Sequence, residues 1–221
     1  AMNVLITGDT SGLGLELKKL YIEQNHNVFG MSRKDGYDLN NIYSIHAFCE
    51  KHKDLYFDTI ILNAATAGIE YGRETHGGDY QYWTDMMRIN CINQAVLLYE
   101  LRHQVTKNVG FVSADASLYS RMLTREKFDK FSKLAYMTTK VSVNMTAMYF
   151  SRLFREMDLS IPVVLFTPSS IDTQFEKQYT AHKPNRHSPS VAAEGIKQQL
   201  DNATMDQNGK FYSYTGEQKE W

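Results

Sequence analysis

Short apolar runs alternate along the chain with longer segments that have helical spacing. The runs are predicted to be buried strands, since branched and aromatic side chains fill them with few polar breaks. They are residues 4–6, 28–31, 56–62, 109–113, 161–166 and 209–214. Apolar residues recur every three or four positions in the helical segments, which are residues 13–24, 42–53, 82–102, 135–157 and 191–200. Between the second run and the second helix, residues 36–39 leave room only for a very short strand or an extended crossing.

This alternation predicts an α/β fold, with a doubly wound parallel sheet of about seven strands as the middle of three α/β/α layers. Residues 66–80 are rich in glycine and polar residues and are predicted to be a long surface loop. Residues 118–134 are charged and irregular, with a short helix expected around 125–131. Repeats, low-complexity tracts and linkers are absent from the sequence, so residues 1–221 are expected to form one domain.

The amino-acid composition argues against several kinds of binding partner. The 24 basic and 25 acidic residues nearly balance, which argues against a nucleic-acid surface. Cys49 and Cys91 lack the spacing of a metal or redox motif and are expected to be reduced thiols, so no metal site is predicted. Neither a membrane span nor a signal peptide is visible, and the expected location is the cytoplasm.

A glycine turn follows the first strand. Gly8, Gly12 and Gly14 are spaced Gly-x-x-x-Gly-x-Gly and lead directly into the first helix. Glycines allow a tight turn and a close approach of the backbone to a diphosphate, while the helix N-terminus offers free N–H groups. The turn therefore predicts a phosphate cradle; the alternative is a purely structural glycine loop.

The end of the second strand carries Ser32 and Arg33. In a dinucleotide-binding sheet this position meets the adenosine ribose, where an acidic residue binds the 2′-hydroxyl of NAD. A hydroxyl next to a guanidinium suits the 2′-phosphate of NADP instead. NADP(H) is therefore the preferred cofactor and NAD(H) the second option; the alternative is a solvated basic turn.

Candidate acid–base chemistry lies in Tyr136 and Lys140. Four residues on a helix make about one turn, so the two side chains share a face. A lysine ammonium favours the phenolate and lowers the tyrosine pKa, which allows proton transfer to or from an alcohol or carbonyl oxygen. A core tyrosine beside a solvated lysine is the alternative.

Taken together, these motifs resemble the short-chain dehydrogenase/reductase family over essentially the whole chain, which implies a Rossmann-like fold. The matching segments are Thr7-Gly8-x-x-x-Gly12-x-Gly14, Asp38-Leu39, Asn63-Ala64-Ala65, Asn90, Tyr136-x-x-x-Lys140 and Pro168-x-x-x-x-Thr173. The resemblance implies catalytic roles for Tyr136, Lys140 and Asn90, with Asn90 anchoring a water in the proton relay. It implies cofactor contacts at Gly8, Thr10, Ser11, Gly12, Leu13, Gly14, Ser32, Arg33, Asp38, Leu39, Asn63, Ala64, Ala65, Tyr136, Lys140, Pro168, Ile171 and Thr173.

The sequence departs from the family pattern at the catalytic serine. The family commonly has a Ser-Ser pair after the fifth strand, whereas Ser113 is followed here by Ala114. Ser113 or Ser117 could supply the missing hydroxyl. Ser113 is the candidate catalytic residue of the two, although a structural role suits its position better. Some members of the family, such as dihydropteridine reductase, work with tyrosine and lysine but no serine. Two milder departures are Ala65 and Ser169, which replace usual glycines.

Three functions remain open. The favoured one is an NADP(H)-dependent oxidoreductase acting on a carbonyl, an alcohol or a pterin-like ring. The others are a nucleotide-sensing scaffold protein and a structural oligomer with a vestigial site. Aromatic residues near the predicted pocket suggest a flat substrate, although they suit packing equally: Tyr71, Trp83, Tyr119, Phe175 and Tyr179.

The loop histidines His182 and His187 are expected to be solvated. The resemblance implies a homodimer or homotetramer formed through helices 82–102 and 135–157. Outer apolar residues that fit such an interface, or equally a core, are Met145, Met148, Tyr149 and Phe150.

Overall fold

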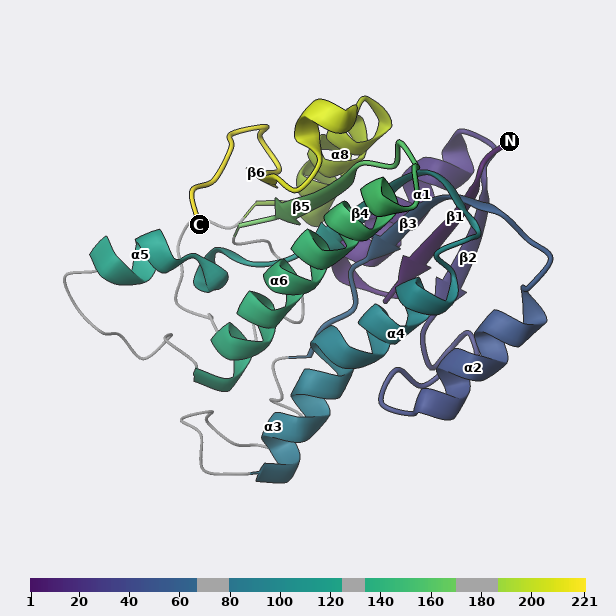
Figure 1. Ribbon diagram of the computed structural model, residues 1–221, viewed down its shortest axis with the longest axis horizontal. Coiled ribbons are helices and arrows are strands. Elements are labelled where there is room, and N and C mark those ends of the chain that lie inside the picture. The colour runs from purple at the N-terminus through teal and green to yellow at the C-terminus, as the bar shows by residue number, and fades with distance from the viewer. Residues whose placement is uncertain (67–79, 125–133, 170–186) are drawn as a thin grey trace.

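The protein contains one six-stranded parallel sheet in the computed structural model, which describes residues 1–66, 80–124, 134–169 and 187–221 (Figure 1). The strands are β1 (Asn3–Thr7), β2 (Asn27–Met31), β3 (Phe57–Leu62), β4 (Val105–Val112), β5 (Val163–Thr167) and β6 (Phe211–Ser213). Their order is β2-β1-β3-β4-β5-β6, and every neighbouring pair is parallel. The chain therefore reverses its direction of winding between β2 and β3, and the carboxyl ends of β1 and β3 lie side by side.

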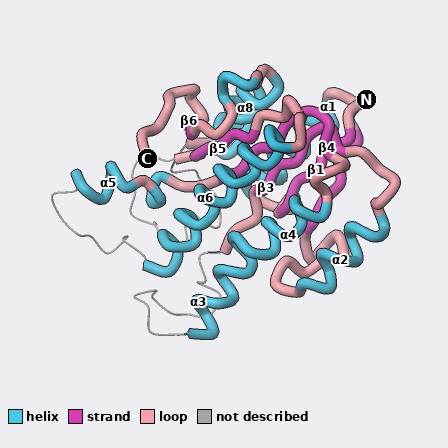
Figure 2. The backbone as a smooth tube through the Cα atoms, viewed as in Figure 1, coloured by secondary structure: helices cyan, strands magenta, loops and turns pink. Residues whose placement is uncertain are grey.

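Helices cover both faces of the sheet (Figure 2). Helices α1 (Gly12–Glu23) and α8 (Pro189–Asp201) pack on one face, and α2 (Ile42–Lys51), α4 (Asn93–Glu100) and α6 (Leu134–Glu156) on the other. The remaining helical segments are α3 (Tyr80–Met87), the π-helical turn η2 (Arg88–Ile92), η3 (Asp115–Ser117), α5 (Tyr119–Thr124) and η4 (Met205–Gln207). The three-layer arrangement predicted from the sequence is confirmed.

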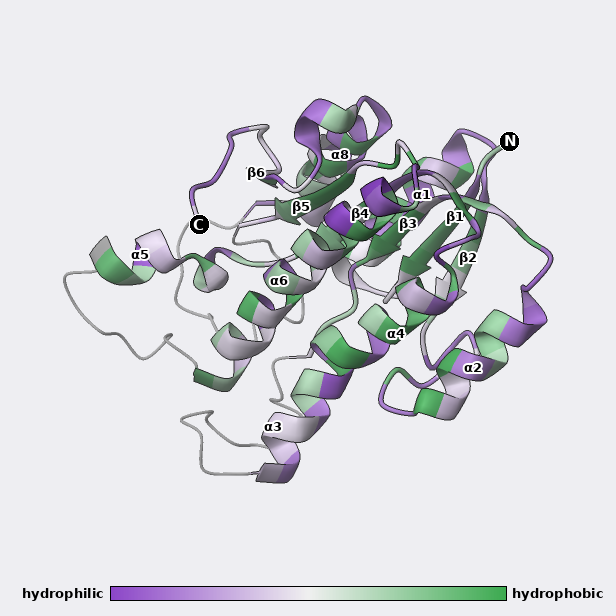
Figure 3. Ribbon diagram, viewed as in Figure 1, coloured by the Kyte–Doolittle hydropathy of each residue, from purple (hydrophilic) through white to green (hydrophobic). Residues whose placement is uncertain are grey.

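Two hydrophobic cores lie on opposite faces of the sheet, because successive strand residues point to opposite sides. In β1, Leu5 packs in the core beneath α2, α4 and α6, whereas Val4 and Ile6 pack beneath α1 and α8. Figure 3 shows the apolar strands between helices whose outer faces are more polar. Phe150 belongs to the first core and is 2% exposed, so it is not an outer residue of α6.

Residues 36–39 form no strand, so the very short strand is the wrong alternative; Gly36 and Leu39 lie in turns between β2 and α2. The structure also differs from the sequence prediction in the following elements. Strand β4 begins four residues before the predicted start, because the exposed Thr106 and Lys107 interrupt its apolar pattern. The π-helical turn divides the predicted helix 82–102, and α5 lies in a segment predicted to be irregular. The short helix expected around 125–131 falls outside the described residues.

None of the described helices is both long and apolar enough to cross a membrane. Cys49 and Cys91 are free thiols, as expected. Among the described residues, no group of three or more histidine, cysteine, aspartate or glutamate side chains is arranged to hold a metal ion.

Candidate active site

The glycine turn lies at the carboxyl end of β1 and packs tightly against β3. Gly8 and Gly12 have φ values of +68° and +54°, in the left-handed region that favours glycine. A Cβ on Gly8 would lie 2.9 Å from the Cα of Ala64, and one on Gly14 would lie 1.9 Å from the carbonyl oxygen of Gly8. All three glycines are therefore required by the backbone or by its packing.

The N-terminus of α1 is available to an external acceptor. Its N-cap residue, Ser11, makes no side-chain capping hydrogen bond. The first N–H groups of a helix have no partner within the helix, and its dipole favours an anion there. Thr10 is half-buried and Ser11 exposed at this point, whereas the Leu13 side chain packs into the core below. This arrangement fits a diphosphate group.

Thr7 joins the first and third strands at the edge of the sheet. Its Oγ1 accepts hydrogen bonds from the backbone N–H groups of Asn63 (2.9 Å) and Ala64 (3.1 Å). The Asn63 side chain donates to the carbonyl oxygens of Thr7 and Gly8, both at 3.2 Å. Asn63, Ala64 and the half-buried Ala65 are therefore held next to the glycine turn.

Gln94 extends this network, and sequence reasoning missed it. Its side chain is 3% exposed; Oε1 accepts from Thr7 Oγ1 at 2.7 Å. Its Nε2 donates to the carbonyl oxygens of Ala64 (2.7 Å) and Ile89 (2.8 Å). One buried amide thus connects β1, β3 and the π-helical turn. A glutamine on the inner face of a predicted helix was the available signal, since a buried amide needs partners.

Asn90 lies in the π-helical turn, and both amide atoms of its side chain make hydrogen bonds. Its Oδ1 accepts from the Thr66 N–H at 2.7 Å, while Nδ2 donates to the Thr66 carbonyl oxygen (2.9 Å) and to Thr139 Oγ1 (3.1 Å). Isolated π turns occur frequently at functional sites, and this one links the segment after β3 to α6.

Tyr136 and Lys140 share one face of α6, 6% and 3% exposed respectively. The Lys140 Nζ lies 5.8 Å from the centre of the Tyr136 ring and donates to the Val112 carbonyl oxygen at 3.2 Å. Burial lowers the pKa of Lys140 to about 8, with Cys91 acting in the opposite direction. The structure thus places a buried tyrosine next to a lysine that can lose its proton near pH 8.

Ser113 is part of a separate buried network. Its Oγ donates to Asn144 Oδ1 at 2.6 Å, and Asn144 Nδ2 donates to Ser117 Oγ at 2.9 Å. Ser117 Oγ in turn donates to the Ala114 carbonyl oxygen at 2.6 Å. The Ala114 side chain packs with the cluster that contains Tyr136. The hydroxyls of Ser113 and Ser117 are therefore both engaged in a network with Asn144, and the residue between β4 and η3 that packs against the Tyr136 cluster carries a methyl group.

A carboxylate, Asp35, lies next to Ser32 and Arg33 at the place predicted to bind the adenosine ribose. Ser32 Oγ donates to Asp35 Oδ2 at 2.6 Å, and Arg33 is exposed. Asp38 Oδ1 accepts from the Asn40 N–H at 2.9 Å. Leu39 is buried, and its carbonyl oxygen accepts from an asparagine of α4. The hydroxyl of Ser32 is therefore directed to a carboxylate within the protein.

Pro168 and Ser169 follow β5, and Ser169 has a φ of +55°. The left-handed backbone explains why glycine is the expected residue there. The predicted cofactor residues Ile171 and Thr173 lie outside the described residues, as do Tyr71, Phe175, Tyr179 and His182.

Replacing Ser169 with glycine is expected to stabilise the protein by about 0.5–1 kcal/mol, because a left-handed conformation costs a serine roughly that much. A thermal or urea unfolding curve measures the change. A decrease in stability would show that the Ser169 side chain contributes more than its backbone costs.

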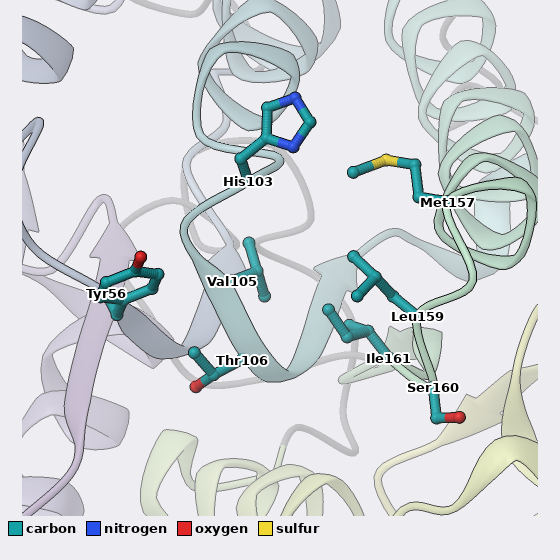
Figure 4. A pocket seen from close by; sticks show the side chains of 8 residues that line it. All are labelled: Tyr56, His103, Val105, Thr106, Met157, Leu159, Ser160 and Ile161. Carbon is teal, nitrogen blue, oxygen red and sulfur yellow. The ribbon is translucent and has the colours of Figure 1, made fainter.

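Of the proposed pocket aromatics that the structure describes, Trp83 packs against the apolar cluster that contains Tyr136, whereas Tyr119 is 60% exposed. The His187 side chain is exposed, with its ring 4.9 Å from that of Tyr214. Figure 4 shows a depression lined by His103, Met157 and Leu159, among other residues, at the amino ends of β4 and β5. It lies at the opposite edge of the sheet and contains none of the candidate residues.

No protein-family model matches the sequence, and no curated protein matches it. Solved structures do share its fold. An NADPH-bound carbonyl reductase from chicken fatty liver is 16% identical, with a TM-score of 0.81 over 100% of this chain and 99% of that one. A Pseudomonas aeruginosa carbonyl reductase in complex with NADP is 18% identical, with a TM-score of 0.76 over 100% and 99%. A short-chain dehydrogenase family protein from Francisella tularensis is 18% identical, with a TM-score of 0.77 over 97% and 98%. The chain therefore has the fold of short-chain dehydrogenases/reductases.

Proposed function

We propose that the protein is an NADP(H)-dependent oxidoreductase of the short-chain dehydrogenase/reductase family. It reduces a carbonyl group or oxidises an alcohol, with residues 1–221 forming one nucleotide-binding domain. The observation that carries the proposal is the buried pair of Tyr136 and Lys140 on one face of α6. The glycine turn, the uncapped start of α1 and the NADP- and NADPH-bound proteins of the same fold support the cofactor assignment.

In this proposal Tyr136 is the acid–base residue. A bound nicotinamide supplies or accepts the hydride. The Tyr136 hydroxyl donates its proton to the carbonyl oxygen as that oxygen gains negative charge. The Lys140 ammonium stabilises the resulting phenolate, and its effect is strengthened because both groups are shielded from water.

The other candidate residues are proposed to bind the cofactor or to position the segments around it. The N–H groups at the start of α1 would hold the diphosphate, with Asn63 and Ala64 alongside. Asn90 fixes the segment after β3 relative to α6 and, in the proposed relay, holds a water. Arg33 would face the 2′-phosphate.

Isotope transfer tests the reaction. Incubation with NADPH deuterated at C4 and a panel of aldehydes, ketones and pterins is expected to yield a product with one deuterium at the reduced carbon, detected by mass spectrometry. Unlabelled substrates throughout, despite nucleotide binding, would contradict the proposed reduction.

The value of kcat/KM for NADPH is expected to fall as the pH rises through about 8. This ratio reports the free enzyme, in which the Lys140 pKa is about 8. Below that pH the ammonium is present; above it the amine is neutral and no longer stabilises a phenolate. In Lys140→Arg the charge persists, so the residual activity is expected to lack this decline. A wild-type profile that is flat to about pH 10 would contradict the assignment.

The second candidate is a catalytically weak nucleotide-sensing protein, favoured by Ala114, which packs against the cluster that contains Tyr136 and supplies a methyl group where the family usually has a serine. Replacing Ala114 with serine separates the two. A serine-independent reductase is expected to change little, whereas an enzyme impaired at this position is expected to gain rate.

A homodimer or homotetramer is also proposed, through α4 and α6. Met145, Tyr149 and Tyr99 are 70%, 56% and 45% exposed on these helices. Sedimentation equilibrium distinguishes such an assembly from a monomer.

A further inference from the structure

A second group of ionisable residues lies beside the glycine turn. Asp9 is the residue after Gly8, and its side chain is 0% exposed. Its Oδ2 accepts from the Lys18 Nζ of α1 at 3.1 Å, while its Oδ1 is buried without a hydrogen-bond partner. A buried carboxyl oxygen without a partner is costly, so this group requires an explanation.

Asp35, in the turn after β2, faces Asp9. A Cβ on Gly30 would lie 2.1 Å from Asp9 Oδ2 and 2.5 Å from Asp35 Oδ2, so the two carboxyl groups meet where Gly30 has no side chain. Two carboxylates this close resist ionising together. Burial raises the pKa of Asp9, and Asp35 raises it further, while Lys18 acts in the opposite direction.

The pair lies where a dinucleotide-binding sheet meets the adenosine ribose. Strands β1 and β2 are neighbours, with Ile6 opposite Gly30 and Thr7 opposite Met31, so the two aspartates follow adjacent strand ends. Asp35 is exposed and accepts from Ser32, whereas Asp9 is buried behind it. A ligand at this edge would meet Asp35 first.

We propose that Asp35, backed by the buried Asp9, determines how well this site distinguishes a ribose 2′-hydroxyl from a 2′-phosphate. The Asp35 carboxylate accepts a hydrogen bond from a ribose hydroxyl and repels a phosphate, against the attraction of Arg33. This inference rests on the proposed function and names the residues that set its cofactor preference.

The preference then depends on pH. Burial and the neighbouring Asp35 carboxyl raise the pKa of Asp9, so Asp9 becomes negatively charged at a higher pH than an ordinary aspartate, and its charge then adds to the repulsion of a phosphate at this edge. The groups that face the pair are Lys18 from α1 and Ser32 from the turn, and Gly30 of β2 contributes no side chain. The affinity for NADPH relative to NADH is therefore expected to fall as the pH rises.

Binding titrations test this without turnover. The Kd values of NADPH and NADH are measured by nicotinamide fluorescence from about pH 4.5, just above the ordinary aspartate pKa, to about pH 8.5 for the wild type, Asp35→Asn and Asp9→Asn. Asp35→Asn is expected to raise the NADPH-to-NADH affinity ratio about tenfold at the upper end. Both variants are expected to flatten its pH dependence. The 2′-phosphate titrates alike in every variant, so differences between variants report the pair.

Glu156→Gln is the matched control, since it removes a surface carboxylate paired with Arg152 at the far end of α6. It is expected to leave the ratio unchanged. Asp35 is exposed, so its variant keeps the test valid even if Asp9→Asn fails to fold. An unchanged ratio in Asp35→Asn, with both nucleotides bound, overturns the inference alone. If neither nucleotide binds the wild type, the proposed function fails and this inference with it.

Discussion

Replacing Tyr136 with phenylalanine is expected to lower kcat by a factor of about 10²–10⁴, the usual contribution of a positioned acid–base group. The substitution removes only the hydroxyl, so the 6% exposed ring keeps its place in the apolar cluster with Tyr82, Met86 and Ala135. Binding of NADPH is expected to change by less than about threefold, because the proton-transfer contribution arises in the transition state. Steady-state kinetics with a substrate identified by isotope transfer measures the first effect, and a fluorescence titration the second.

Tyr82→Phe is the matched control for this prediction. Tyr82 is 5% exposed and belongs to the same apolar cluster as Tyr136. Its variant is expected to keep kcat within about twofold, since its hydroxyl has no assigned role in proton transfer. Equal losses in the two variants would indicate that packing, and not acid–base chemistry, accounts for the effect.

Replacing Gly14 with alanine is expected to destabilise the protein by about 2–3 kcal/mol or more and to weaken nucleotide binding. The added Cβ would stand 1.9 Å from the Gly8 carbonyl oxygen and 2.6 Å from Asn63 Nδ2. The first neighbour is backbone, so relief requires the turn itself to move. Urea unfolding followed by circular dichroism measures the stability, and an NADPH titration measures the binding.

Gly110→Ala tests whether that cost is specific. Gly110 also has no left-handed backbone, and its added Cβ would lie 3.2 Å from the end of the flexible Leu200 side chain and at an ordinary contact distance of 3.5 Å from the Phe166 ring. It is expected to cost less than about 1.5 kcal/mol. Similar losses in both variants would contradict the argument that close backbone contact makes Gly14 necessary.

The pattern of apolar and polar residues along the chain was sufficient to predict the sheet and most of the helices. Each strand carries an apolar run, so the α/β alternation and the layer order could be predicted before the structure. The shared face of Tyr136 and Lys140 also follows from helical spacing alone. The start of β4 was missed because the exposed Thr106 and Lys107 follow its first residue. The buried Asn108 accepts a hydrogen bond from Thr59 of β3 and donates one to the Leu200 carbonyl oxygen of α8.

Contacts between distant residues were not accessible to that reasoning. Gln94 and Thr7 are 87 residues apart, so their hydrogen bond depends on how β1 and α4 pack. The π-helical turn around Asn90 leaves no signature in the apolar spacing of its helix. The sequence does not reveal a role for Asp35, because its proximity to Asp9 depends on the pairing of β1 with β2. Ser32 and Arg33 are the residues of this turn whose chemistry alone suggests a phosphate contact.

The most direct test of the central claim is a titration of the purified protein with NADPH and with NADH, followed by nicotinamide fluorescence. The proposed function predicts saturable binding of NADPH, weaker binding of NADH, and loss of this preference in Arg33→Ala. Absence of binding by either nucleotide would contradict it, and would leave a dehydrogenase fold that serves as a scaffold.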